Sequence, residues 1–158
     1  MILLGIDPGS RICGYGVIET EKQRIRSICF DVIKLSSETP LSERIKIIYE
    51  RISQVIQEIK PDKVGIETIF YGKNIQSAFT LGHIRGAILL SVAQNNLEVI
   101  EISPREVKKA VTGNGNASKQ QVQFMLPKLL GVKIEKLPED AADALAVAYS
   151  IYNKERFR

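Results

Sequence analysis

Apolar residues occur along the chain in two spacings, which predict strands in some segments and helices in others. Residues 2–6 form a continuous apolar run that stops at a turn signal over residues 7–10. Segments 14–18 and 25–34 have the composition of two further strands. The chain is therefore expected to open with three strands in an antiparallel arrangement.

The middle of the chain alternates between helix and strand patterns. Apolar side chains recur at steps of three and four from Leu41 to Ile59, which predicts an amphipathic helix that is stopped by Pro61. A strand is expected over residues 63–67, a long helix over about 74–95, and another strand over 98–102.

The last third of the chain predicts helices over about 104–112, 118–130 and 139–153, with Ser103 and Ser118 as caps of the first two. Neither an internal repeat nor a linker is visible. Three opening strands followed by alternating helices and strands indicate one α/β domain with a mixed sheet flanked by helices.

Composition agrees with a globular domain and adds a weak hint about partners. The chain is 44% hydrophobic and 25% charged, which excludes disordered and low-complexity classes. Its net charge of +4 suits a polyanion such as nucleic acid, although a merely soluble basic protein fits as well. Cys13 and Cys29 form neither a redox nor a zinc motif and are expected to be reduced, partly buried thiols.

The first residues do not resemble a signal peptide, because the apolar start reaches a charge at Asp7. The longest apolar run, around residues 87–93, is too short to span a bilayer. A cytoplasmic protein without membrane contact is expected.

Four acidic residues stand next to strongly apolar sequence. Asp7 and Glu67 each end a predicted buried strand, where ligand sites of open α/β sheets form and where an unpaired carboxylate is costly. Asp140 and Asp143 are three residues apart and share one face of an alanine-rich helix. Each acid alone has a structural alternative: a turn at Asp7, a lysine pair at Glu67, and a helix start at Asp140 and Asp143.

Together, the four acids predict a metal site. Clustered carboxylates repel one another unless a cation neutralises them, and oxygen ligands select Mg²⁺ or Mn²⁺ over zinc. Two such ions, roughly 3.5–4 Å apart, can activate a water and steady the leaving oxygen of a phosphodiester. This indicates a magnesium-dependent nuclease.

The motifs, taken in order along the chain, resemble the RuvC family of bacterial Holliday-junction resolvases. The residues that carry the resemblance are Ile6-Asp7-Pro8-Gly9-Ser10, Gly14-Tyr15-Gly16, Ile66-Glu67 with Phe70, Lys73-Asn74, Ser77-Ala78, Leu81-Gly82, Arg85-Gly86, Val107-Lys108, Ser118-Lys119 and Asp140-Ala141-Ala142-Asp143-Ala144-Leu145-Ala146. The resemblance implies a ribonuclease H-like fold with a mixed five-stranded sheet. It also implies a homodimer, paired symmetric nicks in four-way DNA junctions, and a branch-migration motor complex as partner.

The same resemblance assigns residues to roles. The family's catalytic and metal-binding carboxylates correspond to Asp7, Glu67, Asp140 and Asp143, which would hold two Mg²⁺ ions per site, with Mn²⁺ as a substitute. DNA contacts correspond to Phe70, Lys73, Lys108 and Lys119. From the residues alone, an anchor of its loop in the core is the preferred role for Phe70, and Lys108 could equally belong to a solvated helix face. The only histidine, His83, is expected to be structural.

Two other functions compete with a nuclease. The segment from Gly5 to Gly9 also resembles the first phosphate loop of actin and sugar kinases, but those proteins need two lobes and a second glycine-rich loop. A non-catalytic binding module with the same fold would not need all four acids.

The long helix over 74–95 is expected to form the dimer interface. Its apolar arc spans ~200°, about twice the width that packing on one side requires, and the alternative is a central helix sandwiched within its own domain. The residues placed on that arc are Ile75, Ala78, Phe79, Leu81, Gly82, Gly86, Ile88, Leu89, Leu90, Val92 and Ala93. A two-fold dimer also suits a two-fold symmetric junction that needs two opposed nicks.

Overall fold

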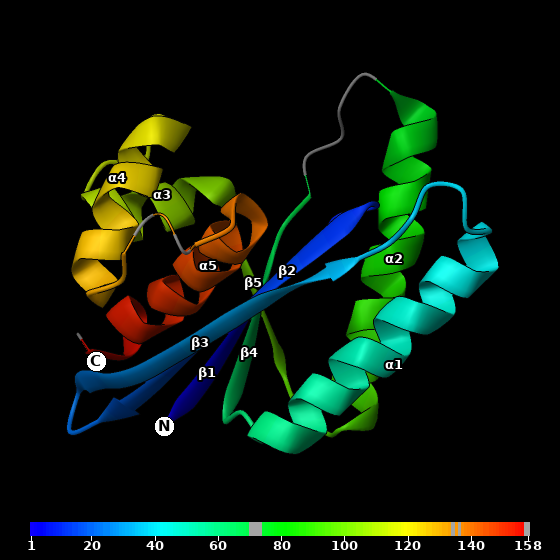
Figure 1. Cartoon of the computed structure of the whole chain (residues 1–158). Helices are drawn as coiled ribbons and strands as arrows, with labels where there is room; N and C mark the ends of the chain where they lie inside the picture. The colour runs from blue at the N-terminus through cyan, green and yellow to red at the C-terminus, as the bar shows by residue number, and fades with distance from the viewer. Residues whose placement is uncertain (70–73, 134, 136, 157–158) are drawn as a thin grey trace.

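The computed structural model describes residues 1–69, 74–133, 135 and 137–156, and it shows one sheet between two groups of helices (Figure 1). The sheet has five strands in the order β3-β2-β1-β4-β5. The strands are β1 (Ile2–Asp7), β2 (Ile12–Glu21), β3 (Arg24–Lys34), β4 (Lys63–Glu67) and β5 (Val99–Ile102). β1, β2 and β3 pair antiparallel, whereas β1, β4 and β5 pair parallel, so the predicted mixed sheet is confirmed.

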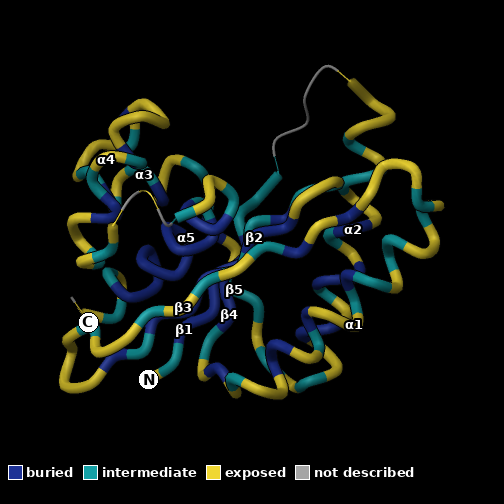
Figure 2. The backbone as a smooth tube through the Cα atoms, in the orientation of Figure 1, coloured by how far each residue is buried: buried dark blue, intermediate teal, exposed yellow. Residues whose placement is uncertain are grey.

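The helices divide between the two faces of the sheet (Figure 1). α1 (Leu41–Ile59) and α2 (Ile75–Gln94) cover one face, and α3 (Pro104–Thr112), α4 (Lys119–Leu130) and α5 (Glu139–Arg156) lie on the other. A separate apolar cluster fills the space on each side of the sheet. In Figure 2 the deepest continuous burial lies along α5 and the central strands.

The predicted elements are all present, with shifted ends. β2 runs over Ile12–Glu21 instead of 14–18, because its ladder with β3 continues through polar residues that an apolar pattern does not mark. α5 continues to Arg156, beyond the predicted end at 153. Ser103 and Ser118 each form a capping box, as expected of the two cap residues.

Glycines in the strands allow α5 to lie directly on the sheet. A Cβ atom at Gly5 would stand 2.1 Å from the backbone oxygen of Ala144, and one at Gly14 would stand 1.9 Å from that of Asp140. No side chain fits at either position, so these strands and the alanine-rich helix meet at backbone distance. The contact at Gly14 fixes the first turn of α5 above the end of β1 and the beginning of β2.

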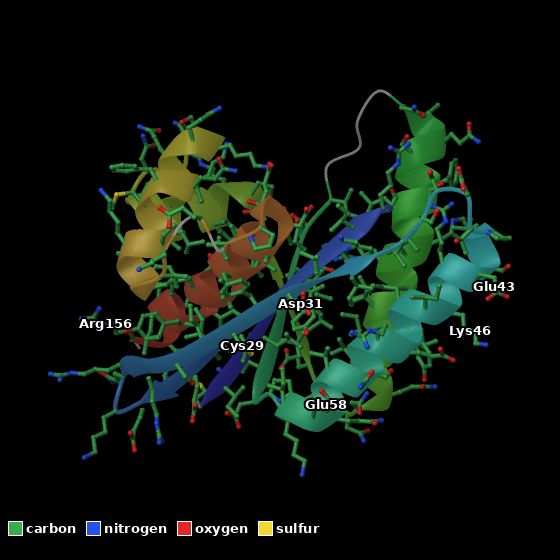
Figure 3. All side chains as sticks on the ribbon, viewed as in Figure 1. Cys29, Asp31, Glu43, Lys46, Glu58 and Arg156 are labelled. Atoms are coloured by element: carbon green, nitrogen blue, oxygen red, sulfur yellow. The ribbon has the colours of Figure 1, made fainter. Side chains whose placement is uncertain are left out.

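Both cysteines are free, but their expected partial burial is wrong. Cys13 is fully buried in the core, where burial raises its thiol pKa to about 12. Cys29 lies on the edge strand β3 and is exposed (Figure 3). Within the described part of the chain, no helix has both the length and the apolar character needed to cross a membrane.

Candidate metal and DNA site

Two of the candidate acids stand side by side at the carboxyl ends of neighbouring strands. Asp7 is the last residue of β1 and Glu67 the last residue of β4, and the parallel register pairs the residues before them, Ile6 and Ile66. Those isoleucines belong to the core beneath α1 and α2. Because side chains alternate along a strand, Asp7 and Glu67 point to the opposite face, toward α5.

The other two acids come from the first two turns of α5. The backbone of Asp140 packs on Gly14, and Gly14 is the residue of β2 that pairs with Asp7. Asp143 follows one turn later on the same helix face. All four acids are partly buried. The fold therefore brings Asp7, Glu67, Asp140 and Asp143 together at one end of the sheet.

The pKa values show that this is a repulsive cluster. Burial, followed by the charges of Asp143, Glu67 and Asp140, raises the pKa of Asp7 from 3.8 to about 8. Burial, followed by the charge of Asp143, raises that of Glu67 from 4.5 to about 6. Burial also raises the pKa of Asp143. A site that holds several carboxylates at such a cost is suited to a bound cation.

Two of the predicted DNA-binding lysines lie at this cluster. The Nζ atom of Lys119 stands 3.2 Å from the Oδ2 atom of Asp143, and its charge lowers the pKa of Asp7, Glu67 and Asp143. Lys108 also lowers the pKa of Glu67. Lys108 is partly exposed on α3, so its predicted DNA contact stays a prediction beside the alternative of a solvated helix face.

Glu139 is a site residue that the sequence reasoning missed. Its Oε1 atom stands 2.5 Å from the Nζ atom of Lys119, and this contact lowers the pKa of Glu139. In the sequence, only its position directly before Asp140 indicates that Glu139 belongs to the site. The partner lies twenty positions earlier in the sequence, and only the packing of α4 beside α5 brings the two together.

The donor set fits Mg²⁺ or Mn²⁺, because every candidate ligand is a carboxylate oxygen and no cysteine or histidine joins the group. Within the described residues, no three histidine, cysteine, aspartate or glutamate side chains already stand in metal-ligand geometry. One of the acids, Asp143, has its Oδ2 atom 3.2 Å from the Nζ atom of Lys119.

The remaining predicted residues divide into two groups. Phe70 and Lys73 lie outside the described residues. His83 is exposed on α2, with its Nδ1 atom 2.7 Å from the carbonyl oxygen of Phe79. α2 covers the face of the sheet opposite the carboxylates, so His83 does not join them.

A mixed sheet in this strand order, with carboxylates converging from two parallel strands and a covering helix, defines a nuclease-type ribonuclease H-like protein. The family model described as crossover junction endodeoxyribonuclease RuvC matches residues 3–150. The chain therefore belongs to the RuvC family.

Individual relatives agree with this assignment. A crossover junction endodeoxyribonuclease RuvC of Chloroherpeton thalassium is 47% identical over 148 residues, which cover 94% of this chain and 80% of the relative. The corresponding Pseudothermotoga lettingae protein is 42% identical, over 94% of this chain and 92% of its own length.

Solved structures give the same result. The structure of T. thermophilus RuvC in complex with Holliday junction substrate has a TM-score of 0.91 and 32% identity, and the match covers 99% of this chain and 96% of that one. The yeast mitochondrial Holliday junction resolvase Ydc2 has a TM-score of 0.63 at 12% identity, over 96% of this chain and 78% of that one, and shares the fold. The ribonuclease H-like fold expected from the sequence is confirmed.

Proposed function

We propose that residues 1–158 form a single metal-dependent nuclease domain that resolves four-way DNA junctions by paired nicks. The observation that carries this proposal is the convergence of Asp7, Glu67, Asp140 and Asp143, in which burial and then the charges of the other three acids raise the pKa of Asp7. The solved complex of the T. thermophilus relative with a Holliday junction substrate supports the choice of DNA. Membership of the RuvC family favours this activity over nucleotide binding.

In this proposal the four acids hold two Mg²⁺ ions, for which Mn²⁺ can substitute. When bound, such a pair of ions activates a water and stabilises the leaving oxygen of a phosphodiester. Asp7 and Glu67 supply ligands from the ends of β1 and β4, whereas Asp140 and Asp143 supply them from the first two turns of α5. Partial burial of Asp7 and Glu67 reduces the screening of their carboxylates by water and strengthens their attraction for a cation.

Lys108 and Lys119 are proposed to bind phosphates of the DNA backbone beside the acids. Both carry an ammonium group close enough to lower the pKa of Glu67, which places positive charge next to the proposed cutting position. Lys73 and Phe70 are proposed to extend this contact, with the aromatic ring stacking on an unpaired base at the crossover. A branch-migration motor remains a proposed partner, and the cytoplasm a proposed location.

The proposed homodimer uses the uncovered side of α2. The apolar arc predicted for this helix needs a correction, because its buried face also includes Ile84 and Ala87, and because Ile88 and Val92 are buried within the domain. Ser91, also buried, donates a hydrogen bond to the carbonyl of Tyr49 on α1. These residues face their own domain and do not serve a partner.

The opposite side of α2 remains open. Ile75, Phe79 and Leu90 are 71%, 66% and 52% exposed, although all three are large apolar side chains. Apart from their sequence neighbours and the backbone of α2 itself, no atom of the described residues lies within 4 Å of a Cβ built on Gly82 or Gly86, which stand on the same side of the helix. A second α2 could therefore approach closely across a two-fold axis and bury this stripe. Such a dimer would present two sites to one junction.

The proposal is tested by separating cutting from binding. The variants Asp7→Asn, Glu67→Gln, Asp140→Asn and Asp143→Asn each remove one ligand charge and little volume. Each should lose junction cutting in Mg²⁺ while retaining junction binding, and Glu50→Gln, an exposed carboxylate change on α1, should cut normally. A ligand variant that cuts at a substantial fraction of the wild-type rate would remove that residue from the proposed site.

A further inference from the structure

Lys119 stands between two acids that have different surroundings. Its Nζ atom lies 2.5 Å from the Oε1 atom of Glu139 and 3.2 Å from the Oδ2 atom of Asp143. The side chain of Glu139 is 60% exposed, whereas that of Asp143 is 29% exposed and belongs to the carboxylate group. The closer contact is therefore with the outer acid.

The lysine acts as an internal cation of the acid group. Its charge lowers the pKa of Asp7, Glu67 and Asp143, so part of the repulsion among these acids is already compensated by Lys119. A metal ion that uses Asp143 must share or displace the Lys119 contact. The same ammonium that compensates the acids can therefore also compete with the ion.

The position of Glu139 determines where this cation rests. Three acids attract the ammonium toward the interior of the group, and Glu139 attracts it outward. Glu139 is the first residue of α5 and precedes Asp140 directly, so the rigid helix that carries two candidate ligands also fixes the outer anchor.

We propose that Glu139 is a positioning residue that holds Lys119 at the rim of the carboxylate group, which leaves Asp143 free to exchange the lysine for a divalent cation. Without Glu139, the ammonium moves inward and pairs more closely with Asp143, where it opposes metal binding. This role rests on the proposed metal site but concerns Glu139 and Lys119, which are not proposed ligands.

The test is a thermodynamic cycle of Mn²⁺ binding to the purified full chain without DNA, measured by calorimetry or by the electron paramagnetic resonance signal of free Mn²⁺. Glu139→Gln should raise the half-saturating Mn²⁺ concentration about two- to five-fold, the scale expected of one exposed ion pair. Glu139→Asp should recover part of this loss. Glu50→Gln, which removes a charge elsewhere on the surface, should change nothing.

The same Mn²⁺ titration in a Lys119→Ala background shows whether Glu139 acts through Lys119. Because Glu139 acts through the lysine, adding Glu139→Gln to Lys119→Ala should produce no further weakening of Mn²⁺ binding. Equal weakening in both backgrounds would overturn the proposal, since Glu139 would then act only as a distant negative charge. Unchanged binding in Glu139→Gln would overturn it as well.

The cycle also separates this inference from the proposed function. If wild-type protein binds no Mn²⁺ at millimolar concentration, the metal site itself fails and the positioning role fails with it. If wild type binds Mn²⁺ but the two changes are additive, the nuclease proposal stands and the role of Glu139 is refuted. Melting curves in chelator should show that every variant is folded.

Discussion

Replacing Asp7 with asparagine should stabilise the metal-free protein while abolishing its activity. A raised folded-state pKa means that the native protein holds Asp7 protonated more readily than the unfolded chain does. The contribution of Asp7 to stability is therefore greatest at low pH and is lost as the pH rises from 3.8 toward about 8. Asparagine has nearly the same shape and carries no charge at any pH.

The size of the effect follows from the two pKa values. One pKa unit corresponds to about 1.4 kcal/mol, and the pKa rises from 3.8 to about 8. At pH 8, where Asp7 is half protonated in the native state, this rise costs the metal-free native state about 5 kcal/mol. At pH 5 Asp7 is protonated in the native state, and the same relation gives a cost of about 2 kcal/mol. The difference of about 3 kcal/mol corresponds to about 10 °C in melting temperature for a chain of this length.

The assay is thermal or urea unfolding in chelator at pH 5 and pH 8. Asp7→Asn should melt above wild type at pH 8, and its advantage should shrink by about 3 kcal/mol at pH 5. Asp31→Asn, a change at an exposed aspartate on β3, should follow wild type at both pH values (Figure 3). Saturating Mg²⁺ should raise the melting temperature of wild type and have much less effect on Asp7→Asn.

The same difference in unfolding free energy between wild type and Asp7→Asn at both pH values would refute the reasoning, because a pH-independent difference cannot come from titration of Asp7. Loss of stability in Asp7→Asn at pH 8 would be equally damaging. It would show that the carboxylate is well accommodated in the metal-free protein, contrary to the repulsion on which the proposed cation site depends.

Three further predictions follow from the packing and the charges. Gly14→Ala should force α5 away from β2, because the new Cβ would stand 1.9 Å from the backbone oxygen of Asp140. Mn²⁺ titration should then show a loss of metal affinity, and unfolding should show a stability lowered by about 1–3 kcal/mol. Lys108→Ala should reduce the slope of junction affinity against salt by about one unit in filter-binding titrations, and an unchanged slope would exclude a phosphate contact. Leu90→Glu should give monomers by sedimentation with normal melting, whereas Ile88→Glu should unfold the protein, because Ile88 is fully buried.

Much of the fold could be predicted because local patterns and tertiary packing agree. The strand that ends at Asp7 and the helix over Leu41–Ile59 bury, fully or in part, the residues that their apolar patterns mark. The acids at the ends of β1 and β4 could be recognised because the sequence shows where each apolar run stops. These features depend on neighbours within a few residues.

Features that depend on distant neighbours could not be predicted in the same way. α2 is apolar around most of its circumference, so periodicity could not show that Ile84 and Ala87 are buried in the core while Phe79 is exposed. The ion pair between Lys119 and Glu139 depends on how α4 packs beside α5. The pairing of β2 with the edge strand β3 extends β2 through polar residues, and an apolar pattern in the sequence does not mark that extension.

The most direct test of the central claim is strand-specific mapping of cuts in a four-way DNA junction. Each of the four strands is labelled in turn, and the full-length protein is incubated with the junction in Mg²⁺ and in chelator, with linear duplex of the same sequence as control. The account predicts nicks at symmetric positions on two opposed strands, only with the metal, and little cutting of linear duplex. Equal cutting in chelator, or equal cutting of linear duplex, would contradict it.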